Sequence, residues 1–389
     1  MRMAHSFKAA LRRASRLMRP PKLGKTARSV QKMMAGLMQA SLPSAVPAKA
    51  AKPKAKPRKP AVPKIGQSLG TVMNQLRAMQ SLMPGAMIPA AAGRPKARVG
   101  APPVPQGAQF VSRTYRCAAG SRGYKLYLPA RHPKQPQGLI VMLHGCSQNP
   151  DDFAVGTHMN ALAEKHGLAV AYAAQTNSHN AAACWNWFKP GDQQRDAGEP
   201  AILAGLTRKL TKDFGLDRER VFVAGLSAGG AMAATLADVY PDLYAAAGIH
   251  SGLARGAARD VLSAMLAMRN GAVGAGAPVA VSPPSAPVRR IVFQGDADRT
   301  VHPSNADAIV AAAVGGADRP AKVIKSAVRG RTYTRSAFAQ ADGAVIVELW
   351  MIEGAGHAWS GGRVAGSYTD AKGPDASAQM LRFFLSKSS

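Results

Sequence analysis

From about residue 110 onward, the spacing of hydrophobic residues alternates between two patterns, one typical of strands and one typical of helices. Short apolar runs of about 4–8 residues predict strands that are buried on both faces, and apolar residues at every third or fourth position predict helices. The predicted strands are Lys125–Leu128, Gly138–Leu143, Ala169–Tyr172, Arg220–Ala224, Ala245–Ile249, Arg290–Gln294 and Val345–Met351. The predicted helices are Asp151–His166, Glu199–Phe214, Ala228–Val239, Asn305–Ala313 and Ala376–Leu385.

This alternation of strands and helices predicts an α/β fold with a mostly parallel sheet covered by helices on both faces. Residues 109–389 are predicted to form one domain, which is long enough to bury a large core. Residues 256–287 are an insertion rich in small residues with a short predicted helix, Val261–Arg269. We expect this insertion to be a surface loop, with a lid over the site as the alternative.

Residues 1–108 differ in kind and are predicted to be a basic, largely disordered leader. Three short stretches carry apolar residues at helical spacing, around Phe7–Met18, Val30–Met38 and Leu69–Met83. Between the last two lies a Pro/Lys/Ala tract, residues 48–61, which we expect to be a solvated, extended spacer. Residues 89–108 form a second linker of Ala, Pro and Gly.

Charge is concentrated in this leader. The chain has 51 Lys and Arg residues and 21 Asp and Glu residues, and residues 1–100 contain 21 of the basic residues and none of the acidic ones. Basic amphipathic stretches with Met-rich faces suit an anionic, hydrophobic surface such as a membrane leaflet or a polyester granule. The Lys/Pro tract equally suits nucleic acid through phosphate neutralisation. A solubilising tail is the third interpretation.

The apolar runs are too short to cross a membrane, and basic residues interrupt the apolar positions of the first twenty residues. The pattern therefore predicts a cytoplasmic or granule-associated protein, with an extracellular protein as the alternative.

Gly225-Leu-Ser227-Ala-Gly229 joins a predicted buried strand to a predicted helix. This is the setting of a nucleophile elbow, in which a sharp strand-to-helix turn exposes a serine oxygen and glycines remove side chains that would block the turn. The alternative is a Ser/Gly loop without chemistry. Ser227 is therefore the candidate nucleophile.

A base and an orienting acid follow in the order Ser, Asp, His, which is typical of α/β-hydrolases. Asp296 and Asp298 lie at the carboxyl end of one predicted strand, and His357 lies in a glycine-flanked loop after another. Asp298 sits further into its loop, so we expect it to orient His357, while Asp296 bonds amides of its own turn. His357 would act as general base and then as general acid.

Backbone amides at the elbow and after an earlier strand are the usual oxyanion donors. The strand ending at Leu143 breaks at His144-Gly145, so the amides of Cys146 and Ala228 are the candidate donors. Three further histidines are assigned other roles. His144 and His250 are predicted to be structural, and His302 is predicted to lie on the rim.

Six motifs resemble the polyhydroxybutyrate-depolymerase-type esterases, relatives of feruloyl and acetyl-xylan esterases. They are Tyr124–Pro129, His144–Gln148, Cys184–Phe188, Gly225–Gly230, Gly295–Val301 and Gly354–Ser360. The resemblance implies an α/β-hydrolase fold, ester hydrolysis through an acyl-enzyme, and no metal or organic cofactor. The Gly-x-x-Asp-x-x-Val pattern of that family again selects Asp298.

The resemblance implies a polyester or short 3-hydroxyacyl oligomer as the first substrate, and a feruloyl or acetyl ester of a plant polymer as the second. An inactive granule-coat or nucleic-acid-associated protein is a further alternative. The sequence contains a serine, an aspartate and a histidine in the order of a catalytic triad, which argues against an inactive protein.

Trp185 and Trp187 are candidate substrate-binding residues, because aromatic rings are few in this chain, and Trp359 is a further candidate wall. Packing in the core is the alternative for the rings of Trp185 and Trp187. The chain has three cysteines and no spacing typical of a zinc site. Cys146 and Cys184 both lie near the proposed site, and a disulfide between them is conceivable, with three free thiols as the alternative.

Overall fold

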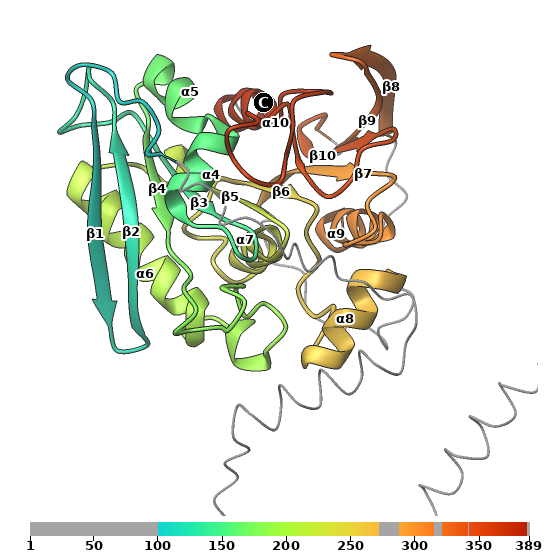
Figure 1. Ribbon diagram of the computed structural model, residues 1–389, viewed down its shortest axis with the longest axis horizontal. Coiled ribbons are helices and arrows are strands. Elements are labelled where there is room, and N and C mark those ends of the chain that lie inside the picture. Colours follow the sequence, from blue (N-terminus) through green and yellow to red (C-terminus); the bar gives the residue numbers. More distant parts are fainter. Residues whose placement is uncertain (1–99, 272–287, 315–320, 341, 387–389) are drawn as a thin grey trace, which may run out of the picture. The chain divides into compact units, whose positions relative to one another are not determined.

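A computed structural model describes residues 100–271, 288–314, 321–340 and 342–386 (Figure 1). The first 99 residues, with the three amphipathic stretches and the Pro/Lys/Ala tract of the predicted leader, lie outside this range. Most of the insertion after residue 271 also lies outside it. Within the described residues, no helix is long and apolar enough to cross a membrane.

A ten-stranded sheet forms the centre of the described region, in the order β1-β2-β4-β3-β5-β6-β7-β10-β9-β8. Its six central strands run parallel and are flanked by antiparallel strands at both edges. This is the α/β-hydrolase architecture. The strands are β1 (Gln109–Cys117), β2 (Gly120–Leu128), β3 (Leu139–Leu143), β4 (Ala169–Ala173), β5 (Val221–Leu226), β6 (Ala246–His250), β7 (Arg289–Gly295), β8 (Ala321–Val328), β9 (Arg331–Ala339) and β10 (Val345–Ile352).

Helices cover both faces of this sheet (Figure 1). Helices α6, α7 and α9 pack on one face and α4, α5 and α10 on the other. The helices are α4 (Pro150–Thr157), α5 (Met159–His166), α6 (Gly198–Phe214), α7 (Ala228–Val239), α8 (Val261–Asn270), α9 (Ser304–Val314) and α10 (Ala376–Leu385). A small parallel pair, β11 (Trp359–Ser360) and β12 (Thr369–Asp370), follows β10.

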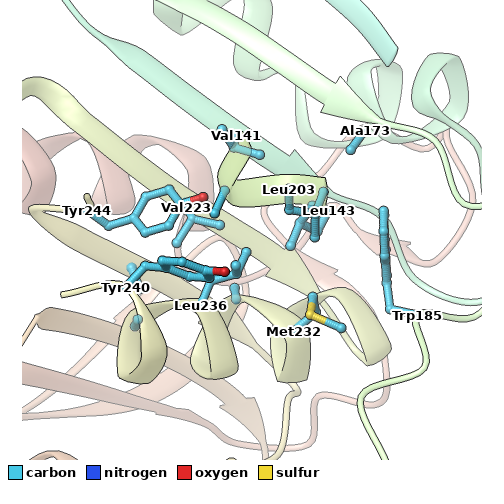
Figure 2. Close-up of a cluster of buried hydrophobic side chains, with 14 of the residues drawn as sticks. Val141, Leu143, Ala173, Trp185, Leu203, Val223, Met232, Leu236, Tyr240 and Tyr244 are labelled. Atoms are coloured by element: carbon cyan, nitrogen blue, oxygen red, sulfur yellow. The ribbon is translucent and has the colours of Figure 1, made fainter. Parts of the chain in front are cut away.

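The central strands have no polar face because helices bury both faces of the sheet. In β3, Val141 and Leu143 join the core under α6 and α7, whereas Ile140 and Met142 join the core on the opposite face. Figure 2 shows the first of these cores, with Val141 near Val223 of β5 and with Leu236 and Met232 on α7 in the same cluster. Successive side chains of a strand point to opposite faces, so a strand between two helix layers is apolar at every position.

Several elements differ from the sequence predictions. The predicted helix Asp151–His166 is two helices, because His158 adopts a left-handed conformation (φ 46°) that ends α4. Strands β1, β8 and β9 were not predicted. Their residues are largely exposed or half-buried, so they lack the apolar runs that identify buried strands.

The parallel strands bring their carboxyl ends to one edge of the sheet. The segments that follow β3, β5, β7 and β10 contain Cys146, Ser227, Asp298 and His357. Loops at this edge form the sites of α/β proteins. The fold therefore gathers residues that are more than 200 positions apart in the sequence.

Candidate active site

Ser227 lies at the turn between β5 and α7, in a strained backbone conformation with φ 57° and ψ −120°. Two close approaches require glycine beside it. A Cβ on Gly225 would lie 2.3 Å from the carbonyl oxygen of Gly229, and a Cβ on Gly229 would lie 2.0 Å from that of Leu143. The Gly-x-Ser-x-Gly spacing thus follows from the tightness of the turn. Strain of this kind is found at functional sites, where the surrounding structure maintains it.

His357 and Asp298 are in contact. The Nδ1 atom of His357 lies 2.7 Å from Oδ2 of Asp298, while Oδ1 of Asp298 accepts the amides of Thr300 and Val301. Burial alone raises the pKa of Asp298, but the hydrogen bond and charge of His357 and the two amides outweigh it, so the pKa of Asp298 is lowered. An ionised Asp298 makes Nδ1 of His357 the protonated nitrogen and leaves Nε2 with a free lone pair.

Asp296 has a different role from the one predicted. It is exposed, and its Oδ1 accepts the amide of Gly354 at 2.7 Å rather than an amide of its own turn. The reason is the parallel pairing of β7 with β10, which places the loops after these two strands side by side. Asp296 therefore fastens the loop that carries His357.

Two backbone amides near Ser227 have no hydrogen-bond partner among the described residues, those of Cys146 and Ala228. The amide of Ala228 is free because it begins α7, where no preceding turn can accept it. The Cys146 loop approaches the same place, because a Cβ on Gly145 would lie 3.6 Å from Cβ of Ser227. These are the two candidate oxyanion donors.

A disulfide bond joins Cys146 to Cys184, the pair considered from the sequence, and Cys117 is free. The bond ties the loop after β3 to the segment before Trp185. The amide of Ser147 also donates to the carbonyl of Ala182, at 3.0 Å. The Cys146 loop is therefore held both covalently and through its backbone.

His144 is a buried structural histidine. Its Nε2 accepts the amide of Gln175 at 3.0 Å, and its Nδ1 donates to the carbonyl of Gly145 at 2.8 Å. Burial lowers the pKa of His144 to about 4, so the ring is neutral near pH 7. Its backbone carbonyl accepts Nε1 of Trp185 at 3.1 Å.

His250, at the end of β6, connects the elements that carry the triad candidates. Its carbonyl accepts the amide of Ser227 at 2.9 Å, and its Nε2 accepts the amide of Ser360 at 3.0 Å. The ring stacks on Phe293 of β7 and on Trp359. Burial lowers the pKa of His250 to about 3. The sequence predicted a structural histidine, but this connecting role depends on long-range contacts that no local pattern reveals.

Two of the three predicted substrate-binding rings are enclosed. Trp185 and Trp359 are 0% and 1% exposed, so neither presents a surface to a ligand. Nε1 of Trp359 donates to Ser377, and its ring packs against Phe153. Trp185 therefore packs in the core, which was the alternative interpretation of its ring, and Trp359 is a buried ring instead of a wall of the site. Trp187 is 6% exposed, and its substrate role stays a prediction.

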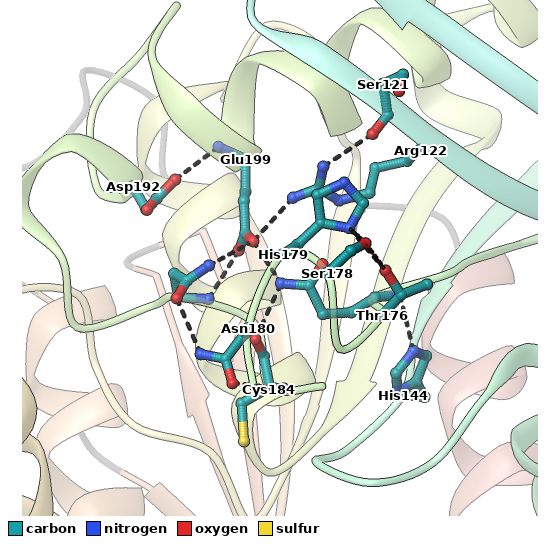
Figure 3. A network of polar contacts seen from close by, with 12 residues as sticks. Ser121, Arg122, His144, Thr176, Ser178, His179, Asn180, Cys184, Asp192 and Glu199 are labelled. Atoms are coloured by element: carbon teal, nitrogen blue, oxygen red, sulfur yellow. Dashed lines mark hydrogen bonds and ion pairs between the residues drawn. The ribbon is translucent and has the colours of Figure 1, made fainter. Parts of the chain in front are cut away.

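A buried ion pair holds the segment that carries Trp185 and Cys184 (Figure 3). Glu199, at the start of α6, pairs with Arg122 of β2 at 3.0 Å, and both are about 5% exposed or less. The Glu199 carboxylate also accepts the amide of Asn186 and the side-chain amide of Gln175. Sequence reasoning missed this pair, because neither residue lies in a chemical motif.

Among the described residues, no cluster of three or more His, Cys, Asp or Glu side chains is arranged to hold a metal ion. In the same part of the chain, no hydrogen bond joins Oγ of Ser227 to His357. Such hydrogen bonds are often long in free enzymes and shorten in complexes.

The sequence matches the family described as Esterase PHB depolymerase over residues 122–334, more than half of the chain. The chain belongs to this family. The match to the PHB depolymerase family contains the elbow, Asp298 and the Cys146 loop, and it ends before His357.

Individual relatives agree with this assignment. The chain is 31% identical over 239 residues to poly(3-hydroxyalkanoate) depolymerase C of Paucimonas lemoignei, covering 59% of this chain and 56% of that protein. It is 27% identical over 197 residues to a probable acetylxylan esterase A of Aspergillus clavatus, covering 47% of this chain and 62% of that protein. The chain thus spans little more than half the length of these curated relatives.

One solved structure supports the fold. The acetyl xylan esterase from Aspergillus awamori superimposes with a TM-score of 0.50 and 20% sequence identity, covering 64% of this chain and 93% of that one. The similarity shows that this chain shares its fold with that enzyme.

Proposed function

We propose that the protein hydrolyses carboxylic esters through an acyl-enzyme formed on Ser227. Membership of an esterase family supports the reaction class. The contact between His357 and Asp298, at the same sheet edge as a serine on a strained elbow, supports the serine mechanism. The 2.7 Å contact between His357 and Asp298 carries the proposal, because it orients a candidate base at the same edge of the sheet as the candidate nucleophile.

In the first half of the reaction, Oγ of Ser227 attacks the ester carbonyl carbon while its proton moves to Nε2 of His357. The negative charge that develops on the carbonyl oxygen is stabilised by the amides of Cys146 and Ala228. Asp298 stabilises the imidazolium form of His357. The tetrahedral intermediate then expels the alcohol, which takes the proton from His357.

In the second half, His357 removes a proton from water, and the resulting hydroxide attacks the acyl carbon. The same two amides stabilise the second oxyanion. Collapse of this intermediate releases the carboxylic acid, and the proton returns to Ser227. The two half-reactions use the same groups in reverse roles.

Turnover of 4-nitrophenyl butyrate by the wild type and by Ser227→Ala tests the mechanism. We expect the wild type to hydrolyse the ester and the variant to lose about 10³-fold or more in kcat. Equal turnover by both proteins would reject Ser227 as the nucleophile. An inactive coat protein would show no turnover in either case.

For the substrate, we propose a 3-hydroxyacyl polyester or its short oligomers. The relative named as a poly(3-hydroxyalkanoate) depolymerase supports this class. The relatives named as acetylxylan and feruloyl esterases support the alternative of a plant-polymer ester. Parallel assays on poly(3-hydroxybutyrate), methyl ferulate and acetylated xylan discriminate between them.

For the compartment, we propose that the catalytic domain works in an oxidising environment. Disulfides persist outside the cytosol and are rare within it, and the Cys146–Cys184 bond ties the Cys146 loop to a neighbouring segment. This favours the extracellular alternative over the cytoplasmic one predicted from the pattern of apolar residues. The leader, with its proposed binding to a granule, a membrane surface or nucleic acid, is a separate question.

A further inference from the structure

Ser147 and Tyr368 bring two hydroxyl groups together at the candidate active site. Ser147 directly follows Cys146, and its Oγ lies 3.2 Å from the hydroxyl oxygen of Tyr368. The carbonyl of Tyr368 accepts the amide of Trp359 at 2.7 Å, two residues beyond His357. The pair therefore spans the loop that carries an oxyanion donor and the loop that carries the general base.

Both residues have backbone conformations that non-glycine residues rarely adopt. The φ angle is 60° at Ser147 and 51° at Tyr368. Each such residue costs on the order of 1–3 kcal/mol, and this strain tends to occur at ligand-binding and catalytic positions. Ser147 is nevertheless exposed, and the Tyr368 side chain is 44% exposed, so burial of these side chains does not explain the strain.

A buried polar network fixes the two loops beneath this pair. Gln148 accepts the amide of Gly145 through Oε1 at 2.9 Å and donates through Nε2 to the carbonyl of Ser367 at 3.0 Å. Asp152 accepts the amide and the hydroxyl of Ser367. Gln148 and Asp152 are 4% and 5% exposed. The hydroxyl pair therefore stands on a rigid base, which is what a specificity element requires.

The aromatic rings first considered for substrate binding cannot take this role, because Trp185 and Trp359 are enclosed. Tyr368 is an exposed aromatic residue next to the Cys146 loop. When its hydroxyl donates to Ser147, the hydrogen of Ser147 Oγ is available to a ligand oxygen. The pair thus offers a hydrogen-bond donor directly after the candidate oxyanion donor Cys146.

We propose that Ser147 and Tyr368 form the acyl-side specificity site, which binds an oxygen on carbon 3 of the acyl group. The oxygen on carbon 3 is three bonds from the reacting carbonyl carbon, and an extended backbone also advances by three bonds, about 3.3 Å, per residue. Ser147 is one residue from the Cys146 amide that faces the reacting carbonyl. The site therefore prefers 3-oxygenated acyl groups over plain acyl chains. This inference rests on the proposed ester hydrolysis at Ser227.

Two esters that differ by a single hydroxyl test the proposal. The full chain is assayed with 4-nitrophenyl butyrate and with 4-nitrophenyl 3-hydroxybutyrate, and the ratio of their kcat/KM values is compared between variants. Tyr368→Phe and Ser147→Ala should each lower the 3-hydroxybutyrate-to-butyrate ratio about 2- to 10-fold, the value of one lost hydrogen bond. Tyr115→Phe, on edge strand β1, is the matched control and should leave the ratio unchanged.

If both variants lose activity equally on the two esters, or lose none, so that the ratio of the kcat/KM values is unchanged, the inference is overturned. The proposed function still stands in that case, provided that Ser227→Ala loses its turnover. Wild-type rates in Ser227→Ala would instead reject the proposed function. Urea unfolding midpoints establish that each variant is folded. If Ser147→Ala unfolds, the ratio measured for Tyr368→Phe decides alone, because that change keeps the ring and removes the hydroxyl that orients the Oγ of Ser147.

Discussion

Three histidines at the site have separate roles, and their environments explain why. His144 and His250 are fully enclosed, and each accepts a backbone amide through Nε2. A nitrogen that accepts an amide cannot also carry a proton, so these two rings are neutral in the native state. The His357 side chain is 12% exposed, and its Nδ1 contacts the carboxylate of Asp298.

Burial of His250 predicts a pH dependence of stability. The pKa of His250 is lowered to about 3, whereas an unfolded chain protonates histidine near its ordinary value of about 6.5. Between these values the unfolded state binds the extra proton, so the free energy of unfolding falls as the pH falls, by about 1.4 kcal/mol per pH unit for each such histidine. His144 acts in the same direction down to about pH 4.

His250→Gln isolates this contribution, because glutamine retains a donor and an acceptor but does not titrate. We expect the slope of the free energy of unfolding against pH, measured by urea denaturation between pH 6.5 and 4.5, to be smaller in the variant by about one proton. Buried Glu199, whose pKa is raised, has the opposite slope in both proteins and cancels in the comparison. Identical slopes in the variant and the wild type would contradict the assignment.

Asp298 and Asp296 provide a matched pair for the orienting acid. Asp298→Asn removes the charge that fixes the tautomer of His357, and we expect kcat to fall by roughly 10³- to 10⁴-fold, as in triads of the same geometry. Asp296→Asn keeps an acceptor for the Gly354 amide, so kcat should change less than about threefold. Steady-state kinetics on a soluble ester measure both. A larger loss in the Asp296 variant would reverse the assignment.

At the scale of elements, the spacing of hydrophobic residues along the sequence was enough to predict the helices and the buried strands. The parallel strands, the helices around them and the positions of Ser227, Asp298 and His357 follow from apolar runs and the turns that end them. Strands β8 and β9 were missed because the described residues of β8 are exposed and those of β9 are mostly half-buried, so neither strand has an apolar run buried on both faces. The contacts made by Gln148, His250 and Tyr368 also have no local signature, since each joins segments about 100 residues apart or more.

The ion pair of Glu199 and Arg122 predicts an asymmetry between buried and exposed charges. Glu199→Ala leaves Arg122 buried without its partner, so we expect a loss of about 3–5 kcal/mol in the free energy of unfolding. The exposed pair of Lys209 and Asp213 on α6 is the control, and Asp213→Ala should cost less than about 1 kcal/mol. Urea denaturation measures both, and similar losses would indicate that the buried pair contributes little.

Glu199→Ala should also affect catalysis through the segment it holds. Glu199 contacts the amide of Asn186, and Cys184 in the same segment is bonded to Cys146. We therefore expect a fall in kcat at temperatures where the variant is still folded, because the oxyanion donor at Cys146 becomes less well positioned. The control variant Asp213→Ala should retain its kcat.

At the scale of the whole molecule, charge separates two regions of the chain. Residues 1–100 carry 21 Lys and Arg residues without a single Asp or Glu, whereas the rest has 30 basic and 21 acidic residues. The rest of the chain therefore has a net charge of +9, less than half of the +21 of residues 1–100, and attracts a polyanion less strongly at long range. Any strong electrostatic association of the full chain should therefore come from the leader.

Deletion of residues 1–99 tests this division. We expect the full chain to co-sediment with anionic phosphatidylserine vesicles at about 20 mM salt and to be released near 500 mM, because the Debye length shrinks from about 20 Å to about 4 Å. The deletion variant should remain in the supernatant while it hydrolyses 4-nitrophenyl butyrate at the wild-type rate. Since each basic residue near an anionic leaflet contributes about 1 kcal/mol, the leader has more than enough charge to dominate binding.

The controls of the same experiment separate the three interpretations of the leader. Retention on neutral vesicles or on polyester granules at high salt would assign the binding to the Met-rich apolar stretches, since apolar contacts are not screened. Binding to DNA but not to vesicles would assign it to phosphate neutralisation by the Lys/Pro tract. If the full chain stays in the supernatant with all three partners at low salt, the basic segment is a solubilising tail.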